Sequence, residues 1–460
     1  MALGRRQEER QQEMWVATAE LPKSEGHVFY RKLNDLLAQS GFDRFVEELC
    51  RPHYHATMGR RGIPPGVYFR MLLVGYFEGI GSQRGIAWRC ADSLSLRAFL
   101  GVPLIEETPD HSSLTRVRDR LPLDVHTAVF RFVLRVAAEQ GLLKGKAVAV
   151  DATTLEANAA MKSIVRRDTG EDWQEYLKRL MQEEGLIHQE DEPTDEELRR
   201  FDRKRKNKKV SNEEWVSPSD PQARITKMKD GRTHLAYKAE HVVDLQTELL
   251  LAAEIYPADH ADTNTLVDSV MEAQTHISEA GLDEQIEEAV ADKGYHAAAT
   301  LELADDLNVR TYIPEPKAKH PRRWTDKPEA YQRAVYNNRR RTKTAKNRRL
   351  QRQRSEKAER SFAHVCQTGG ARRTWLRGLD KVKKRYLMSA VARNLGLVMR
   401  ALFGIGTARS LQQAGDLLAL VQFTWFYIWG ILRRIESQSP RLAPGNANVA
   451  IDRRASACAA

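Results

Sequence analysis

The spacing of hydrophobic residues divides the chain into a helical first part and an α/β second part. Up to Gly141, apolar residues recur at helical intervals and little resembles a strand. This spacing is clearest in residues 28–37, 66–79 and 124–140. Pro64 and Pro65 suit the start of the second of these helices, and Ser112 could cap a further helix before Leu121. We therefore predict an all-α N-terminal region.

After Lys144 the pattern changes to short apolar and β-branched runs separated by amphipathic segments. Strand-like segments are residues 146–152, 234–243, 249–255, 288–291 and 309–313, and helical segments are residues 262–273 and 296–307. Residues 244–248 (DLQTE) suit a hairpin turn. The order strand, strand, strand, helix, strand, helix, strand predicts a mixed α/β sheet flanked by helices.

A polar excursion of about residues 160–230 separates the first two strands, with an acidic stretch followed by the basic run RRFDRKRKNKK. A loop of this length does not fit inside a compact sheet, so we interpret it as a partly helical or disordered insertion. The expected organisation is a helical domain over residues 1–141, a catalytic domain over residues 142–400 and a helical tail over residues 401–460.

Positive charge is concentrated late in the chain. The whole protein of 460 residues has a net charge of +11, yet residues 321–385 hold 22 Lys and Arg against 5 Asp and Glu. The segment's net charge of +17 exceeds that of the whole protein, so the remainder is net acidic. Tyrosines alternate with arginines and lysines in its middle. Such clustering favours a nucleic-acid partner over a merely solvated helix face.

The cysteines, the N-terminus and the apolar segments indicate the cellular compartment of the protein. Four widely separated cysteines with no CxxC pair argue against a disulfide scaffold and fit a reducing compartment. Cys50, His53 and His55 resemble half a metal site, but no second half follows, so we expect ordinary side-chain roles. The charged N-terminus is not a secretory signal. Residues 417–432 are strongly apolar but fall short of the ~20 residues of a spanning helix. We expect a cytoplasmic protein with no membrane partner.

Three acidic residues occupy special places in this layout. Asp151 ends the first strand, Asp292 follows the fourth strand, and Glu359 lies on the helix expected after the basic stretch. Carboxylates at the ends of adjacent strands would meet at one edge of the sheet, and a helix packed there could supply the third. Clustered carboxylates repel each other unless a cation neutralises them. Oxygen ligands of this kind suit Mg²⁺, and two ions could promote in-line displacement at phosphorus.

The same residues lie in a series of recognisable motifs. The helical part contains GRRGIPP (residues 59–65) and TPDHSSLTRVRDRL (residues 108–121). The second part contains AVDATTLEANA around Asp151, HLAYKAEHVVD ending at Asp244, ADKGY around Asp292, and AERSFAH followed by RGLDKVK. In these motifs and their order, over about residues 30–400, the chain resembles the DDE transposases of bacterial insertion sequences. These enzymes have a ribonuclease H-like catalytic domain after a helical N-terminal transposase domain.

The resemblance implies roles for individual residues. Asp151 would bridge two Mg²⁺ ions (or Mn²⁺), Asp292 would bind one of them, and Glu359 would bind the other or help take the proton. The residues implied in DNA contacts or in lining the site are Lys293, Tyr295, Arg352, Arg354, Arg360, Arg377, Lys383 and Lys384. Glu356 is the rival third acid, but Phe362 follows Glu359 at the family's spacing. The chain departs from the family's pattern near Glu359. Relatives often have a lysine seven positions after the glutamate, where this chain has Cys366, and a tyrosine and an arginine shortly before it, where this chain has Ser355 four positions before.

The activity implied is DNA strand cleavage and transfer at the terminal inverted repeats of the enzyme's own insertion sequence. Its partners would be the terminal repeats and target DNA, bound by a homodimer, in a bacterial protein associated with the nucleoid. Two alternatives stay open. One is a transposase-derived repressor that binds DNA without catalysis, and the other is a metal-dependent nuclease without strand transfer.

Overall fold

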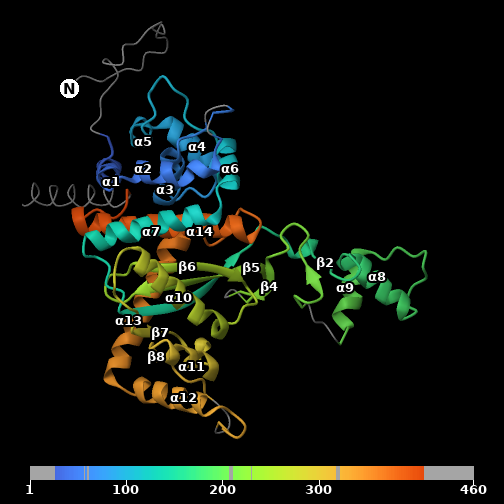
Figure 1. Cartoon of the computed structure of the whole chain (residues 1–460). Coiled ribbons are helices and arrows are strands. Elements are labelled where there is room, and N and C mark those ends of the chain that lie inside the picture. The colour runs from blue at the N-terminus through green and yellow to red at the C-terminus, as the bar shows by residue number, and fades with distance from the viewer. Residues whose placement is uncertain are drawn as a thin grey trace, which may run out of the picture. The chain divides into compact units, whose positions relative to one another are not determined.

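The computed structural model describes residues 26–55, 57–59, 62–206, 211–228, 231–317 and 322–408 (Figure 1). Its first part is helical, as predicted. The helices are α1 (Val28–Gln39), α2 (Phe42–Cys50), α3 (Pro65–Glu78), α4 (Gln83–Asp92), α5 (Leu94–Leu100), α6 (His111–Arg120) and α7 (Leu123–Glu139). Aromatic rings fill their core. For example, Phe29 and Phe77 meet edge to face with ring centroids 4.7 Å apart.

The cap of α6 corrects one expectation. Asp110, not Ser112, is the capping residue, because its carboxylate accepts a 2.7 Å hydrogen bond from the Ser113 N–H. Ser112 lies inside the first turn and donates its hydroxyl to Asp110 at 3.1 Å. A carboxylate also interacts better than a hydroxyl with the positive end of the helix dipole.

A six-stranded mixed sheet follows the helices. The strands are β1 (Ala147–Glu156), β4 (Arg224–Lys227), β5 (Thr233–Asp244), β6 (Leu250–Pro257), β7 (Glu288–Val290) and β8 (Arg310–Tyr312). β1 is central, antiparallel to β5 on one side and parallel to β7 on the other, and β8 extends the sheet beyond β7. β6 and β4 pair with successive parts of the outer edge of β5. The predicted class, a mixed α/β sheet preceded by a helical region, is confirmed.

Helices cover both faces of the sheet. Helix α10 (Asp262–Glu279) packs on one face, where Thr265 and Ser269 bind Glu240 of β5. The opposite face carries α13 (Ala345–Phe362) and α14 (Leu379–Phe403), where Ser361 and Tyr386 bind His241. Because neighbouring strand residues point to opposite faces, Glu240 contacts α10 on one face and His241 contacts α13 and α14 on the other. Helix α11 (Ala298–Asp306) links β7 to β8, and α12 (Glu329–Thr342) precedes α13.

Helix α14 joins the helical part to the sheet. It contacts α7 and α3 as well as strand β6 (Figure 1). Asn394 of α14 is fully buried, accepts a hydrogen bond from the Leu250 N–H at 2.9 Å and donates to the Leu250 carbonyl at 2.8 Å. A π-helical segment (Ala363–Thr368) ends α13 before the chain turns toward α14.

The insertion is partly helical, as predicted, and has its own small core. Helices α8 (Trp173–Glu183) and α9 (Asp195–Lys204) each begin with a capping box. They pack together through Leu177, Met181, Leu198 and Phe201. Short strands β2 (Val165–Arg166) and β3 (Trp215–Val216) pair with each other. β4, inside the expected span, belongs to the main sheet.

Over the residues that the structure describes, no helix combines the length and apolarity needed to cross a bilayer. The apolar segment of residues 417–432 lies outside the described residues.

A buried amide that fixes α12 gives a test of the fold. Asn338 is 1% exposed, accepts from the Ile313 N–H at 3.1 Å and donates to the Ile313 carbonyl at 2.8 Å. Asn338→Ala should lower the free energy of unfolding by about 2 kcal/mol, because two buried backbone groups lose their partner. The shift in the urea unfolding midpoint measures this loss.

The adjacent Asn337 is the matched control. Its half-buried amide makes only a 3.4 Å contact with Asp305, so Asn337→Ala should change the midpoint little. Equal effects of the two substitutions would contradict the assigned role of Asn338.

Candidate active site

Two of the three predicted carboxylates belong to neighbouring strands: Asp292 follows β7, whereas Asp151 lies within β1, which continues to Glu156 and does not end at Asp151 as expected. β1 and β7 pair in parallel with Ala149 opposite Val290. Asp151 and Asp292 each lie two residues beyond this last paired position. Neighbouring strands lie about 4.8 Å apart, so residues far apart in the sequence become neighbours. Asp292 follows β7 directly and caps a short 3₁₀ turn (Lys293–Tyr295), accepting from the Gly294 N–H at 2.7 Å.

Helix α13 is fastened to this edge by two polar side chains. Gln351 donates its amide to the carbonyls of Ala291, at 3.2 Å, and Tyr312, at 2.7 Å. Arg354 donates to Gln351 at 3.1 Å and forms an ion pair with Asp151, with Nη1 2.9 Å from Oδ2. The arginine side chain is 16% exposed and the aspartate side chain 23%. The guanidinium therefore neutralises the Asp151 carboxylate in this structure.

The third carboxylate, Glu359, forms no ion pair among the described residues. Its side chain is exposed and accepts a hydrogen bond from the Ser355 hydroxyl at 3.4 Å. Its rival Glu356 pairs with Arg360, which also binds Glu248. Among the described residues, no three His, Cys, Asp or Glu side chains are close enough together to hold a metal ion. The Cys50 half-site forms no such group either, and burial raises the pKa of the Cys50 thiol to about 11.

The available donors nevertheless have the chemistry that a divalent cation requires. Mg²⁺ is commonly held by one or two carboxylates together with phosphate oxygens of the substrate. Asp151 and Asp292 offer such oxygens from adjacent strands, so the two residues fit a Mg²⁺ or Mn²⁺ ion. Arg354 competes with such an ion for Asp151.

A buried polar network supports the edge from the other face of the sheet. Glu240 is fully buried and accepts hydrogen bonds from Thr265, Ser269 and Tyr295. Lys238 is 3.1 Å from Glu240 and 2.7 Å from Asp262. Burial, followed by the charge of Glu240, raises the pKa of Tyr295 well above its ordinary value, so the phenol stays a neutral donor.

This network brings a further acid to the site. A Cβ atom at Gly294 would lie 3.0 Å from oxygens of both Asp262 and Asp292, so the two carboxylates flank this glycine. Lys238, Glu240 and Asp262 were not among the residues predicted from the sequence. The charged positions in the otherwise apolar segment HLAYKAEHVVD were the available signal.

Two known protein families match parts of the chain. Residues 17–120 match the family described as "Transposase domain (DUF772)", and residues 316–398 match the "Transposase DDE domain". The first spans most of the helical region, and the second spans α12, α13 and most of α14. Both matched families are transposase domains, which confirms the resemblance to the DDE transposases. No curated protein and no solved structure matches it.

The residues expected to contact DNA do not form one continuous surface in the transposase. Lys293, Arg352 and Arg377 are exposed. Lys383 lies 3.5 Å from Glu254, whereas Lys384 is buried and paired with Asp380 at 2.6 Å. Arg354 and Arg360 form the ion pairs described above, and Tyr295 is buried.

Some cations of the basic segment form ion pairs within the protein, and others are exposed. Arg339 pairs with Glu315, Arg341 with Asp305, and Lys346 with Glu288, so these cations fasten α12 and α13 to the segment after β8, to α11 and to β7. Other cations of the segment are exposed and have no ion pair among the described residues, namely Arg333, Arg340, Lys343, Arg348, Arg349 and Arg352. Transposase domains imply DNA binding, and these exposed side chains can contact phosphates.

Histidine 241 links α13 and α14 to the strand beside Asp151. Ser361 donates its hydroxyl to the Ala358 carbonyl at 2.7 Å, so its oxygen accepts from His241 Nδ1 at 2.8 Å. His241 Nε2 then accepts from the Tyr386 hydroxyl at 2.7 Å. Burial and the charge of Arg393 hold the pKa of His241 well below its ordinary value. The imidazole is therefore neutral in the folded protein.

Acidification should consequently destabilise the transposase. Below about pH 6.5 the unfolded chain protonates His241 while the folded state excludes that proton, so stability present above this pH is lost as the pH falls. His241→Gln should reduce the difference between urea midpoints measured at about pH 7.5 and pH 5.5. His260→Gln, at an exposed histidine, should leave that difference unchanged. An unaltered difference in the His241 variant would refute this account.

Proposed function

We propose that the transposase cleaves DNA at the terminal inverted repeats of its own insertion sequence and joins the freed 3′ ends to target DNA. The main support is that Asp151 of β1 and Asp292, just after the parallel strand β7, occupy corresponding positions, with Arg354 of the arginine-rich helix α13 paired to Asp151. Acids at such an edge suit phosphoryl transfer, and exposed cations nearby suit the substrate's phosphates.

The reaction proposed depends on divalent ions. Asp151 and Asp292 would hold Mg²⁺ or Mn²⁺, two ions in all, and Glu359 would complete the site from α13. When bound, the ions would polarise the phosphate and lower the pKa of an attacking water or hydroxyl. In this proposal, DNA binding accompanies a local rearrangement of α13 that brings Glu359 toward the two aspartates.

The chain's own groups prepare this site. Gln351 keeps α13 against the ends of β7 and β8, and the buried Glu240 network supports Asp292 from below. Arg354 would exchange its carboxylate partner for a DNA phosphate, freeing Asp151. Lys293, next to Asp292, is exposed and free to approach the same phosphate.

Transposition requires two element ends to be held together, so a homodimer on DNA is the assembly that we propose. The helical region would contribute end recognition, dimerisation or both. Its contacts with α14 connect it to the sheet that carries the acids.

Isosteric substitutions test the carboxylates. Asp151→Asn, Asp292→Asn and Glu359→Gln should each slow Mg²⁺-dependent nicking of a labelled inverted-repeat end by at least about a hundredfold. Binding of the same DNA, measured by gel shift, should change little. Glu356→Gln is the matched control on the same helix and should cleave normally. Normal cleavage by the Asp292 variant would refute the assignment.

The same assay separates the alternative functions. A repressor without catalysis would bind the DNA end without nicking it, and a nuclease would nick it without joining. The Asp151–Arg354 ion pair is the observation that favours the repressor, since it neutralises one of the proposed metal ligands. Joining of the labelled end to target DNA would exclude both.

The ion pair makes a separate prediction about metal binding. Arg354→Gln removes the cation that competes for Asp151, so Mn²⁺ should bind about tenfold more tightly without DNA. Isothermal titration calorimetry of the full-length protein measures this change. Arg352→Gln is the control, because that arginine is exposed and leaves Asp151 paired. Weaker Mn²⁺ binding in the Arg354 variant would contradict the competition.

A further inference from the structure

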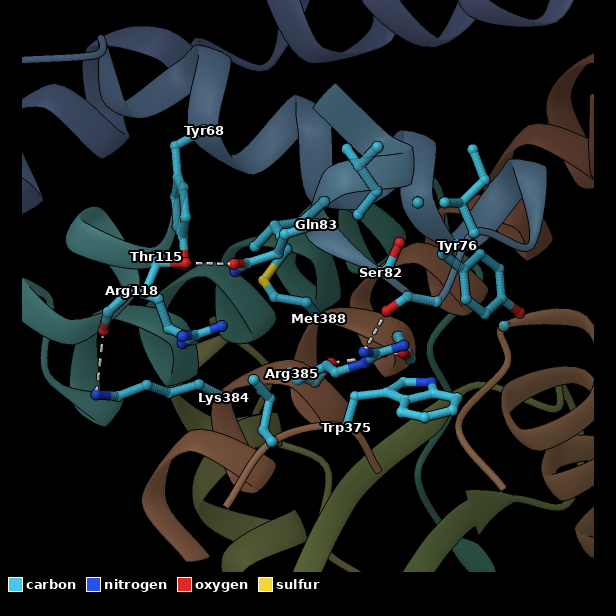
Figure 2. Close-up of a pocket in the computed structure, with 18 residues that line it drawn as sticks. Tyr68, Tyr76, Ser82, Gln83, Thr115, Arg118, Trp375, Lys384, Arg385 and Met388 are labelled. Atoms are coloured by element: carbon cyan, nitrogen blue, oxygen red, sulfur yellow. Dashed lines mark hydrogen bonds between the residues drawn. The ribbon is translucent and has the colours of Figure 1, made fainter. Parts of the chain in front are cut away.

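A cavity of about 330 Å³ lies away from the carboxylates, between the helical region and α14. Its walls come from α3, α4, α6, α14 and the segment around Trp375 (Figure 2). The lining residues important here are Tyr68, Gly81, Gln83, Arg118, Trp375 and Arg385. The volume is at the lower end of the range for small-molecule sites, on the order of 300–1,000 Å³.

The cavity is positively charged. Arg118, Lys384 and Arg385 line it, and none of its lining residues is acidic. Lys384 is neutralised by Asp380 at 2.6 Å. Arg385 donates to the Gly81 carbonyl at 2.5 Å and has no ion pair within the described part of the chain. The remaining positive charge favours an anionic occupant.

Arg118 provides the second sign of a ligand. It is 7% exposed, and its Nε atom is buried without a hydrogen-bond partner among the described residues. The same Nε atom lies 3.5 Å from Asp119 Oδ1, and that carboxylate also faces Lys381 at 3.4 Å, so its charge is shared between two cations. Burial and the charge of Arg118 lower the pKa of Arg385 to about 10. An anion between the two guanidinium groups would relieve their repulsion and give Arg118 Nε a hydrogen-bond acceptor.

An exposed indole stands beside these charges. Trp375 is 54% exposed. A Cβ atom at Gly81 would lie 3.3 Å from Trp375 Nε1 and 3.7 Å from Arg385 Nη2, so ring and cation converge on one point. Arg373 covers one face of the indole, with its guanidinium 5.2 Å from the ring centroid. An aromatic ring beside a guanidinium suits a flat ring attached to an anionic group, and bases commonly stack on such rings.

The segment carrying Trp375 is tied to the strand that carries Asp151. The Glu156 N–H donates to the Arg372 carbonyl at 3.1 Å, and the Thr374 N–H donates to the Glu156 carbonyl at 2.9 Å. Glu156 lies five residues after Asp151 on β1, a strand length of roughly 17 Å at about 3.3 Å per residue. The strand length between Asp151 and Glu156 is therefore shorter than one turn of DNA, which is about 34 Å.

We infer that this cavity binds a single nucleotide, with its phosphate between Arg118 and Arg385 and its base against Trp375. The nucleotide is either free or an unpaired nucleotide of a DNA strand. The strand-borne form rests on the proposed function, because it takes DNA as the substrate.

Binding of small probes to the full-length protein tests the inference directly. Deoxyadenosine monophosphate should bind saturably and quench tryptophan fluorescence. Inorganic phosphate and deoxyadenosine should each bind at least about tenfold more weakly, because each lacks one half of the recognised group. Equal affinity for inorganic phosphate would overturn the inference by showing a simple anion site.

Substitutions then locate the site. Arg118→Gln should weaken nucleotide binding about tenfold, whereas Arg118→Lys should retain part of it. Arg116→Gln, at an exposed arginine two residues earlier on α6, should stay within about twofold of wild type. Trp375→Phe should keep binding, measured by calorimetry, but lose most of the quenching. Gly81→Leu should block binding without removing any charge, and melting curves would confirm that the variants fold.

A single-stranded DNA pentanucleotide distinguishes the two sources. Binding of this probe but not of the mononucleotide, with the same loss in Arg118→Gln, supports a strand-borne nucleotide. Binding of neither probe, or equal losses in the Arg116 and Arg118 variants, overturns the inference. Cleavage of the element end is a separate readout, so failure here leaves the proposed catalysis distinguishable.

Discussion

The register of the central strand is the constraint on which the candidate site depends. β1 pairs antiparallel with β5 and parallel with β7, so its position is fixed from both sides. A shift of β7 by one residue would turn Asp292 to the opposite face from Asp151. Both faces are buried, by α10 on one side and by α13 and α14 on the other, which makes such a shift costly. Hydrophobic packing thus determines where two charged groups meet.

Much of this arrangement was predictable because the strands have clear apolar runs. These runs identify β1 and β7, whose parallel pairing gives Asp151 and Asp292 corresponding positions, although β1 continues to Glu156 instead of ending at Asp151. The orientation of α13 was not predictable in the same way. Ala358 is buried, and Glu359, one residue later, is turned by about 100° around the helix. The family's spacing can identify the glutamate, but tertiary packing decides which way its side chain faces.

Other features were hidden for identifiable physical reasons. Glu240 and Lys238 lie in a strand that is buried on both faces, where charges are normally excluded. Their hydrogen bonds and ion pairs come from α10 and the turn after β7, which only the fold brings together. The Arg354–Asp151 pair likewise joins residues from opposite ends of the catalytic region. Asp110 displaced Ser112 as the cap because both suit that role and only the backbone decides between them.

The paired hydrogen bonds of Asn338 have a geometric consequence for the basic helix. An α-helix can adjust its position by sliding along its axis, which combines a rise of about 1.5 Å with a rotation of about 100° per residue. Such a slide would carry the amide away from Ile313, so α12 is locked in both translation and rotation. Its outward arginines therefore keep a constant spacing from the carboxylates. In the proposed reaction, the fixed position of α12 would set the distance between a phosphate bound by these arginines and the bond that is cleaved.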